Sequence, residues 1–510
     1  MKRKTLLAAV GVAATVMLAA CGGGSAASGA GGSTSTTYTF ATVFQPTTWD
    51  PAKADPTTAG PFFEAVYDTL LIRDGNAKIQ PGLATKWKYN KDQTQLTLTL
   101  RTGVTFTDGE KLDAAAVVAN LEHYRDADGP STSDLASVRD IKAVGADSVV
   151  LTLTSPDPAL VEHLATAVGY MAAPNAIKGG HLGTTPVGSG PYTLDTAHTV
   201  PGSKYVFKAN PKTWRHDVYQ TIDISYMPDP NAALNALKAG QVNAAMLTDL
   251  QAAAAAQQAG FQRIQFSPST VGLFIFDRDG KITPALKDVR VRQAINYAVD
   301  AKALVDAFLG GTKIGTLTRQ SFGPDSDAWD PSLDSAYPYD PGKAKQLLAE
   351  AGYPNGFTVT MPYYTLLGTG VLDSLKEMLG KVGITVKYDQ MAPEDVQPAL
   401  LAGKYSMSLL TEFYDNDWTT MTTYFTPDAP FNPFHVQDPA IDGLIRDYQF
   451  ASDSQRPAIA KKVNENVVDQ AWTDIWAYGQ PSILVNSKAV KVSQSNFAGF
   501  PSLFNFASAS

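Results

Sequence analysis

Short runs of apolar residues with two different periods follow one another along the whole chain. Leu96, Leu98 and Leu100 alternate with threonines, which predicts a half-buried strand within 86–100. Comparable runs predict strands at 37–44, 148–154, 205–207, 222–224, 271–277, 357–363 and 384–388, and short strands after Ile483. Apolar residues at helical spacing predict helices at 62–71, 114–123, 230–239, 251–259, 288–309, 340–351, 372–382, 441–451 and 457–470. Because strands and helices interleave throughout, the predicted fold class is α/β.

Some boundaries of these elements carry signals of their own. Asp113 precedes a predicted helix at the N-cap position, where its carboxylate can accept from free backbone N–H groups. Pro341 takes the first position of another helix, which proline favours. Asp288 and Arg292 stand four residues apart on one helix, so we expect a weak ion pair between them. The proline-rich stretch 46–61 is expected to be a loop.

The first 21 residues have the pattern of a secretion signal. Lys2, Arg3 and Lys4 form a positively charged start, and an apolar stretch follows from Leu6 to Ala20. This stretch is too short to cross a bilayer comfortably, since that takes about 20 apolar residues, but it fits the core of a signal peptide. It ends at Cys21, the single cysteine in the sequence. Small residues before a cysteine resemble a bacterial lipobox, so residues 1–20 are predicted to be removed and Cys21 to carry lipid.

Residues 21–36 are predicted to be a flexible tether. They are Gly, Ser, Ala and Thr after the cysteine, with no apolar side chain larger than alanine. Such a segment buries too little apolar surface to offset its conformational entropy. A flexible chain of this length spans about 20 Å on average. We therefore expect a folded body held close to the outer face of a cell membrane by a lipid anchor.

Charge and hydropathy exclude two classes of protein. The formal net charge is −8, and removing residues 1–20 takes away three basic residues and no acid, which leaves −11. Proteins that bind nucleic acid need clustered Lys and Arg, and the sequence has no basic run after the signal. No later apolar run is long enough to span a membrane. We expect an acidic, secreted protein that binds no nucleic acid.

The sequence carries little that would suit an enzyme. It has neither an HExxH nor a GxSxG motif, and its six histidines are dispersed at 123, 163, 181, 198, 216 and 435. We therefore predict no metal site, no cofactor and no catalytic residue. A pair of acids for glycoside hydrolysis is the one enzymatic alternative that sequence leaves open.

Four segments, in this order, resemble a known family. They are 101–109 (RTGVTFTDG), 188–192 (GSGPY), 288–300 (DVRVRQAINYAVD) and 340–354, which ends in AGYP. Together they resemble the bacterial extracellular solute-binding proteins of the peptide/nickel type, which serve ABC importers. The resemblance implies a two-lobed, three-domain periplasmic-binding-protein fold (class II) with mixed sheets and a hinge. Domain I would comprise 37–68, 185–280 and 481–510, domain II 69–184, and domain III 281–480.

The resemblance also implies where a ligand would sit. Family members that bind peptides place an acidic residue of the third domain against the peptide's α-amino group. In the matching stretch, Asp415 fits by its pairing with Asn416, and Asp417 fits by its distance to the aromatics that follow, so both stay candidates.

The residues themselves favour a site in the same stretch. Three carboxylates and three aromatics lie within 412–418. A buried carboxylate favours a cationic partner, and aromatic rings add stacking or cation–π contacts. The predicted ligand-binding residues are Asp415, Asp417, Trp418, Phe413 and Tyr414, with Trp49 and Phe276 (or its neighbour Phe274) as secondary candidates.

These expectations describe a monomeric lipoprotein of the cell membrane that captures a small solute and delivers it to an ABC permease. The favoured solute is a dipeptide or oligopeptide. The alternatives are a non-peptide ligand (an oligosaccharide, a nickel chelate or an opine) on the same fold, and a surface lipoprotein with a signalling role.

Overall fold

The structure is a computed structural model that describes most of the chain after residue 36. The described residues are 37–127, 129–215, 219–266, 269–308, 315–324, 326–363, 369–413, 416–479, 482–497 and 500–509. The predicted signal peptide 1–20, Cys21 and the tether 21–36 therefore lie outside the described residues, as do Tyr414 and Asp415 of the predicted ligand site.

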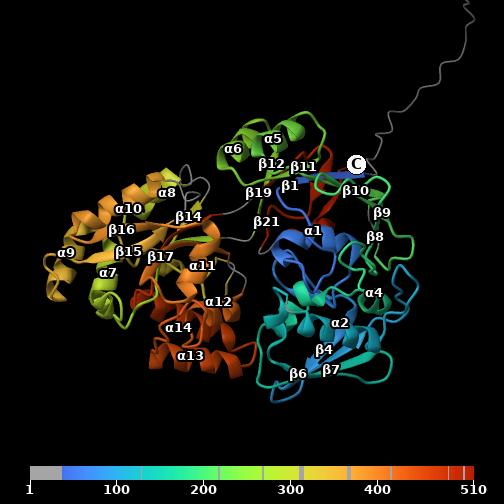
Figure 1. The fold of residues 1–510 in the computed structure, drawn as a ribbon, viewed down its shortest axis with the longest axis horizontal. Helices are drawn as coiled ribbons and strands as arrows, with labels where there is room; N and C mark the ends of the chain where they lie inside the picture. The colour runs from blue at the N-terminus through green and yellow to red at the C-terminus, as the bar shows by residue number, and fades with distance from the viewer. Residues whose placement is uncertain are drawn as a thin grey trace, which may run out of the picture.

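The described chain forms two lobes that lie side by side (Figure 1). The first lobe comprises residues 37–266 and 482–509, and the second comprises 269–479. Strand β12 ends at Phe266 in the first lobe and β13 begins at Ser269 in the second. Strand β18 ends at Gly479 in the second lobe and β19 begins at Ser482 in the first. The chain thus passes between the lobes at two places, each over a very short distance in sequence.

An eight-stranded mixed sheet forms one half of the first lobe. Its order is β21-β12-β19-β11-β1-β10-β9-β8, with β1 pairing in parallel with both β10 and β11. The strands are β1 (Thr37–Thr42), β8 (Tyr192–Leu194), β9 (Lys204–Ala209), β10 (Thr221–Tyr226), β11 (Ala244–Leu247), β12 (Gln262–Phe266), β19 (Ser482–Val485) and β21 (Asn496–Phe497). Helices α1 (Pro56–Val66), α5 (Pro230–Lys238) and α6 (Leu250–Gln258) pack on it, and β20 (Val490–Val492) pairs with β22 (Phe506–Ser508) in the C-terminal tail. Residues from the two ends of the chain and from its middle therefore share one sheet.

The other half of the first lobe is built around the sheet β4-β5-β7-β6. Its elements are β2 (Leu71–Arg73), β3 (Ile79–Pro81), β4 (Ala84–Tyr89), β5 (Gln95–Leu100), β6 (Val138–Ala143), β7 (Ser148–Leu153), α2 (Ala114–Asp126), α3 (Leu160–His163) and α4 (Pro174–Gly179). The alternation predicted for β5 is confirmed, because Leu96, Leu98 and Leu100 are buried. Asp113 caps α2 as predicted, accepting from the backbone N–H of Ala116.

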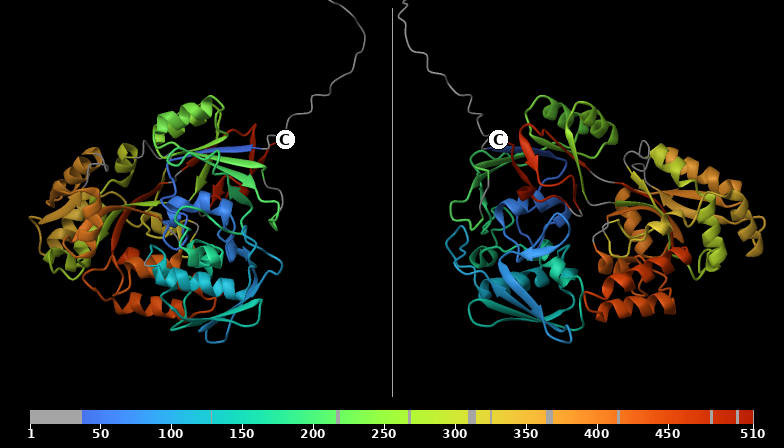
Figure 2. Two further views of the ribbon diagram at one scale, coloured as in Figure 1. Left: turned by 45° about the vertical axis from the view of Figure 1, so that its right-hand side comes forward. Right: turned by 180° about the vertical axis from the view of Figure 1, so that it is seen from behind.

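The second lobe surrounds the sheet β14-β18-β13-β17 and the parallel pair β15–β16. The strands are β13 (Ser269–Ile275), β14 (Gly315–Leu317), β15 (Thr358–Tyr363), β16 (Thr385–Gln390), β17 (Met407–Phe413) and β18 (Thr473–Gly479). The helices are α7 (Val289–Ala298), α8 (Ala301–Phe308), α9 (Pro341–Glu350), α10 (Thr369–Lys381), α11 (Pro393–Leu401), α12 (Asp417–Tyr424), α13 (Pro439–Phe450) and α14 (Arg456–Asp469). The view from behind shows the same separation into two bodies (Figure 2).

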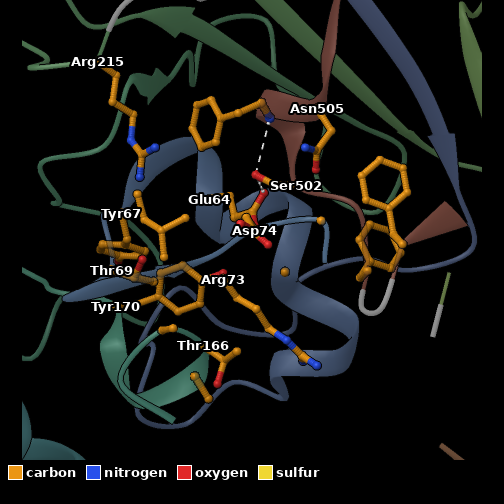
Figure 3. Close-up of a pocket in the computed structure, with 18 residues that line it drawn as sticks. Glu64, Tyr67, Thr69, Arg73, Asp74, Thr166, Tyr170, Arg215, Ser502 and Asn505 are labelled. Carbon is orange, nitrogen blue, oxygen red and sulfur yellow. Dashed lines mark hydrogen bonds between the residues drawn. The ribbon is translucent and has the colours of Figure 1, made fainter. Parts of the chain in front are cut away.

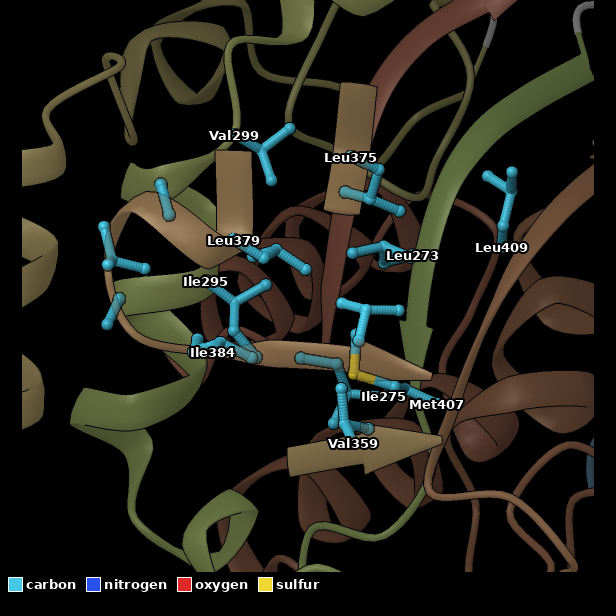
Figure 4. Close-up of a cluster of buried hydrophobic side chains, with 14 of the residues drawn as sticks. Leu273, Ile275, Ile295, Val299, Val359, Leu375, Leu379, Ile384, Met407 and Leu409 are labelled. Carbon is cyan, nitrogen blue, oxygen red and sulfur yellow. The ribbon is translucent and has the colours of Figure 1, made fainter. Parts of the chain in front are cut away.

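A large apolar core holds the second lobe together (Figure 4). Leu273 and Ile275 of β13 meet Ile295 of α7 and Leu375 and Leu379 of α10, and all five side chains are fully buried. Each such side chain contributes about 1.5–3 kcal/mol by leaving water. Because the sequence has one cysteine, an intrachain disulfide cannot substitute for these contacts.

The predicted single helix 288–309 is wrong, since the structure has two helices there. Val299 is extended (φ −99°, ψ 118°) and its carbonyl accepts from Arg319 at 3.3 Å. Asp300 then starts α8 by accepting from the backbone N–H of Ala303 at 3.0 Å. The partner Arg319 comes from a later segment, so the pattern of residues 288–309 does not reveal this break.

The predicted Asp288–Arg292 ion pair also differs from the structure. Asp288 pairs instead with Arg290, with 2.6 Å between Nη2 and Oδ2. Arg292 is buried and donates to backbone carbonyls, among them those of Leu286 and Gln470. Arg292 therefore joins α7 to the end of α14.

The prediction for residues 46–71 needs a similar correction. The helix α1 runs from Pro56 to Val66, so it begins inside the predicted loop 46–61 and ends before the predicted limit at residue 71. Proline at a first helical position explains the early start. At the C-terminal end of α1, Gly188 and Gly190 pack closely on the backbone of Val66. An added Cβ would lie 2.1 Å from Val66 O at residue 188 and 2.4 Å from Val66 C at residue 190.

Candidate functional site

The predicted ligand-binding stretch lies at the end of β17 and the start of α12, on the side of the second lobe that faces the first (Figure 1). Phe413 is the last residue of β17, and Asp417 is the first residue of α12. Asn416 caps this helix by accepting from the backbone N–H of Thr419 at 2.8 Å. The structure thus places the described parts of this stretch at the end of a strand and at the start of a helix.

Asp417 and Trp418 have defined partners within the second lobe. Asp417 is buried and accepts a hydrogen bond from the Ser326 hydroxyl. Trp418 is half-buried and stacks nearly parallel on Tyr448 of α13, with ring centroids 6.1 Å apart and 6° between the planes. The start of α12 is therefore held from two sides, by Ser326 and by α13.

Glu412 is a further candidate that the sequence prediction did not single out. Its carboxylate accepts a hydrogen bond from the Tyr424 hydroxyl at 2.8 Å. Burial raises the pKa of Glu412 above its ordinary value, and the bond from Tyr424 opposes this only in part. The signal in the sequence was a single acid in the strand Met407–Phe413, which is otherwise apolar or neutral. A carboxylate in a low-dielectric setting attracts a cation more strongly than one in water.

The two secondary candidates are packed inside the lobes. Trp49 is 7% exposed and stacks on Phe63 at 6.0 Å, while the Tyr67 hydroxyl donates to its carbonyl at 2.7 Å. Phe276 is 1% exposed and lies 6.3 Å from Phe431. Ligand contact by these two side chains stays a prediction.

An aromatic cluster packs around Tyr424, the hydrogen-bond partner of Glu412. The ring of Tyr424 lies 5.1 Å from that of Phe274 and 5.2 Å from that of Phe431. Phe274 is 4% exposed, so water is excluded from the part of the cluster around its ring. The rings fix the position of the Tyr424 hydroxyl and, through it, the position of the Glu412 carboxylate.

A cavity of about 160 Å³ lies elsewhere, inside the first lobe between α1, β2 and the C-terminal tail (Figure 3). The Glu64 carboxylate on its wall accepts from Ser502 Oγ and from the backbone N–H of Leu503, both at 2.9 Å. Arg215, also on the wall, donates from Nε to Asp68 Oδ1 at 2.8 Å. Among the predicted ligand residues whose side chains the structure describes, Trp49, Phe276, Asp417 and Trp418 are not part of its lining. Ligand pockets usually measure about 300–1,000 Å³, so this cavity is smaller than a typical ligand site. We interpret it as a gap in the packing between the C-terminal tail and α1.

None of the helices in the described ranges has both the length and the apolar character needed to cross a bilayer. The same ranges contain no group of three or more His, Cys, Asp or Glu side chains placed to hold a metal ion.

Comparisons with known proteins point to one family. The family model for bacterial extracellular solute-binding proteins, family 5 (middle region), matches residues 78–433. The chain is 29% identical over 478 residues to the glutathione-binding protein GsiB of Salmonella paratyphi A (strain ATCC 9150 / SARB42), with 89% of this chain and 90% of GsiB covered.

Solved structures share the fold at lower identity. DppA from Helicobacter pylori, an ABC transporter-associated periplasmic binding protein in complex with the peptide STSA, has a TM-score of 0.75 and 21% identity, covering 93% of this chain and 98% of DppA. AgaA from A. tumefaciens R10, in complex with agropinic acid, has a TM-score of 0.72 and 23% identity, covering 91% of this chain and 96% of AgaA. These similarities confirm the predicted α/β fold of periplasmic binding proteins.

Proposed function

Because this chain belongs to the family 5 bacterial extracellular solute-binding proteins, we propose that it captures a small peptide between its two lobes and delivers it to an ABC permease. GsiB is a glutathione-binding protein and DppA was solved with a tetrapeptide, so two relatives take peptide ligands. AgaA, with agropinic acid, marks the alternative of a non-peptide solute on the same fold. The fold alone does not choose between these ligands.

The observation that carries the peptide proposal is the pairing of acid and aromatic groups where β17 meets α12. Glu412 and Asp417 supply carboxylates, and Trp418 supplies an aromatic surface at the same turn. The free amino group of a peptide is a cation, and a desolvated carboxylate is its natural partner. Burial around Glu412 raises its pKa and provides the desolvation that makes such a contact selective for a cation.

We further propose that Cys21 carries the lipid that anchors the protein, so that the folded body stays near the permease that it serves. Stable anchoring takes more than one acyl chain, because a single chain binds membranes only reversibly. The Gly- and Ser-rich composition after Cys21, which predicts a tether, supports this arrangement.

A ligand panel tests this function directly. Purified protein is titrated calorimetrically with glutathione, the tetrapeptide Ser-Thr-Ser-Ala and agropinic acid, and solutes that co-purify are identified by native mass spectrometry. We expect saturable binding of at least one peptide, weakened at least tenfold in the Glu412→Gln or Asp417→Asn variant. Binding of agropinic acid alone would replace the peptide proposal with an opine proposal. No binding and no co-purified solute would overturn the receptor function.

A further inference from the structure

The two lobes touch each other at the end of the molecule away from the two chain crossings (Figures 1 and 2). The contact joins the β4–β5 turn of the first lobe to the region between α13 and α14 of the second. Gln93 Nε2 donates to the carbonyl of Ala451 at 3.1 Å, and Gln93 Oε1 accepts from Arg456 Nη2 at 2.9 Å. Nearby, Gln449 Nε2 donates to the carbonyl of Pro156 at 3.0 Å. Both polar ends of the Gln93 amide are therefore used across the lobe boundary.

The backbone of Gln93 is in an unfavourable conformation. Its φ is +53°, in the left-handed region that glycine and asparagine enter more easily. The turn is held by Asn90, whose Oδ1 accepts from the backbone N–H groups of Thr94 and Gln95 at 2.8 and 3.0 Å. A glycine at residue 93 would make this turn with less strain but would reach nothing across the boundary. Strained residues of this kind concentrate at functional positions.

Arg456 is fixed in place before it reaches Gln93. Its Nη1 donates to Asp453 at 2.7 Å, and its Nε donates to the carbonyl of Tyr448 at 3.4 Å. Its guanidinium also lies over the Tyr448 ring, 5.7 Å from the centroid. Because these contacts hold the side chain, little conformational entropy is lost when it binds Gln93.

Tyr448 links this contact to the candidate ligand site. The Tyr448 ring makes a cation–π contact with the Arg456 guanidinium. It also stacks in parallel on Trp418 at the start of α12. A ligand that moves Trp418 therefore acts on the ring that supports Arg456. The chain of contacts runs from Gln93 through Arg456 and Tyr448 to Trp418.

We propose that Gln93 and Arg456 form a latch that holds the two lobes closed, and that Tyr448 couples this latch to the ligand site at Trp418. The coupling rests on the proposed capture of a solute between the lobes, whereas the latch itself does not. A ligand that binds the closed form gains apparent affinity in proportion to the closed population. The latch residues set this population without touching the ligand.

Distance measurements without any ligand test the latch. Cys21 is the single cysteine, so a Cys21→Ser chain can carry spin labels at Lys88→Cys and Lys461→Cys, both exposed and on opposite lobes. We expect Gln93→Ala and Gln93→Gly to shift the distance distribution toward longer separations. The control Gln346→Ala removes a glutamine whose bond to Glu350 stays within α9, and it should leave the distribution unchanged. Identical distributions for Gln93→Ala, Gln93→Gly and the parent would overturn the latch.

The thermal stability of Gln93→Gly separates the latch from a purely structural turn. A glycine relieves the positive φ, so we expect the melting temperature to stay equal or rise while the lobes open. A variant that opens because its turn has unfolded would melt earlier, and that result would contradict the latch. Arg456→Ala should open the lobes too, and the double variant Gln93→Ala/Arg456→Ala should open them no further than either single one.

The coupling has its own test. Tyr448→Phe keeps the ring and should behave like the parent, whereas Tyr448→Ala removes the stack and should shift the distances as Gln93→Ala does. With glutathione and Ser-Thr-Ser-Ala as probes, Gln93→Ala should weaken the binding of whichever peptide the parent binds by about tenfold, mainly through faster dissociation. An opened Gln93→Ala variant with unchanged affinity would keep the latch but refute the coupling. If the parent binds neither probe, the distances still decide the latch.

Discussion

The Tyr424 hydroxyl donates a hydrogen bond to Glu412 Oε2 at 2.8 Å, at the edge of a dry aromatic cluster. The bond provides one partner for a carboxylate that has lost much of its hydration. Burial dominates, so the pKa of Glu412 is raised. A fold that keeps such a group loses stability at neutral pH, which is a common property of binding sites.

Glu412→Gln is therefore expected to stabilise the protein at pH 7. A raised folded pKa means that, between the ordinary and the raised value, the folded state holds a proton that the unfolded state has released. Stability contributed by Glu412 is thus present below its ordinary pKa and is lost as the pH rises through the folded value. Melting curves from pH 4 to 8 should show a smaller fall with rising pH in Glu412→Gln than in the parent. Melting temperatures that change with pH in the same way in Glu412→Gln and the parent would contradict a raised pKa at Glu412. Glu377→Gln, which alters an exposed carboxylate paired with Lys381, serves as the control.

Gly190→Ala should destabilise the first lobe strongly. An added Cβ at residue 190 would lie 2.4 Å from the backbone carbon of Val66 and 2.6 Å from the backbone nitrogen of Tyr67. Because backbone atoms cannot move aside as a side chain can, we expect a loss of about 2–4 kcal/mol in the free energy of unfolding.

A matched control for Gly190→Ala lies on α10. Gly380 of this helix has nothing within 4 Å of an added Cβ. Gly380→Ala should therefore be neutral or stabilise by up to about 1 kcal/mol through helix propensity. Urea unfolding of both variants measures the difference. Similar stabilities for the two would mean that residues 188–190 do not require the close approach.

The pair Asp50–His123 should make the first lobe sensitive to acid. His123 Nε2 lies 2.9 Å from Asp50 Oδ1 and joins α2 to the loop after β1. The bond from His123 and the backbone N–H of Ala52 outweigh burial and lower the pKa of Asp50. A lowered folded pKa contributes stability that is present above the ordinary value of about 3.9 and is lost as the pH falls through the folded value.

Asp50→Asn is expected to cost about 1–3 kcal/mol at pH 7, because it weakens a charge-assisted hydrogen bond in a mostly buried position. The difference between Asp50→Asn and the parent should shrink as the pH falls below about 4, because the unfolded chain then takes up a proton at Asp50 before the folded protein does. Urea unfolding at pH 7 and pH 3 gives both numbers, with the exposed Asp306→Asn as the control. An equal difference at the two pH values would contradict this account.

Local patterns predicted much of the fold. The alternation of Leu96, Leu98 and Leu100 and the cap at Asp113 depend on neighbours in sequence, so they could be read directly. The break at Val299 could not be read, because its carbonyl is bound by Arg319 from a different segment. Periodicity cannot show a contact between residues that are distant along the chain.

The candidate site shows the same limit. The cluster of acids and aromatics at 412–418 suggested a ligand site in this stretch for a physical reason, since those side chain types recognise cations. How strongly Glu412 is desolvated depends on Tyr424 and Phe274, and that is a property of packing. The bond between Gln93 and Arg456 is harder still to predict, because these residues are 363 positions apart in sequence and meet only once both lobes are folded and brought together.

Cys21→Ser should release the protein from the membrane without changing its fold. The cysteine precedes β1 by a stretch that is Gly-, Ser- and Thr-rich, so we expect no change in the melting temperature of the folded body. Each acyl methylene buried in a bilayer contributes about 0.8 kcal/mol, so losing the acylated residue removes nearly all affinity for the membrane. Fractionation of cells that express the parent or Cys21→Ser, together with the mass of the mature N-terminus, measures both effects. A Cys21→Ser protein that still sediments with membranes, or a parent whose mature mass carries no acyl group, would refute the anchor while leaving the ligand site and the latch open to their own tests.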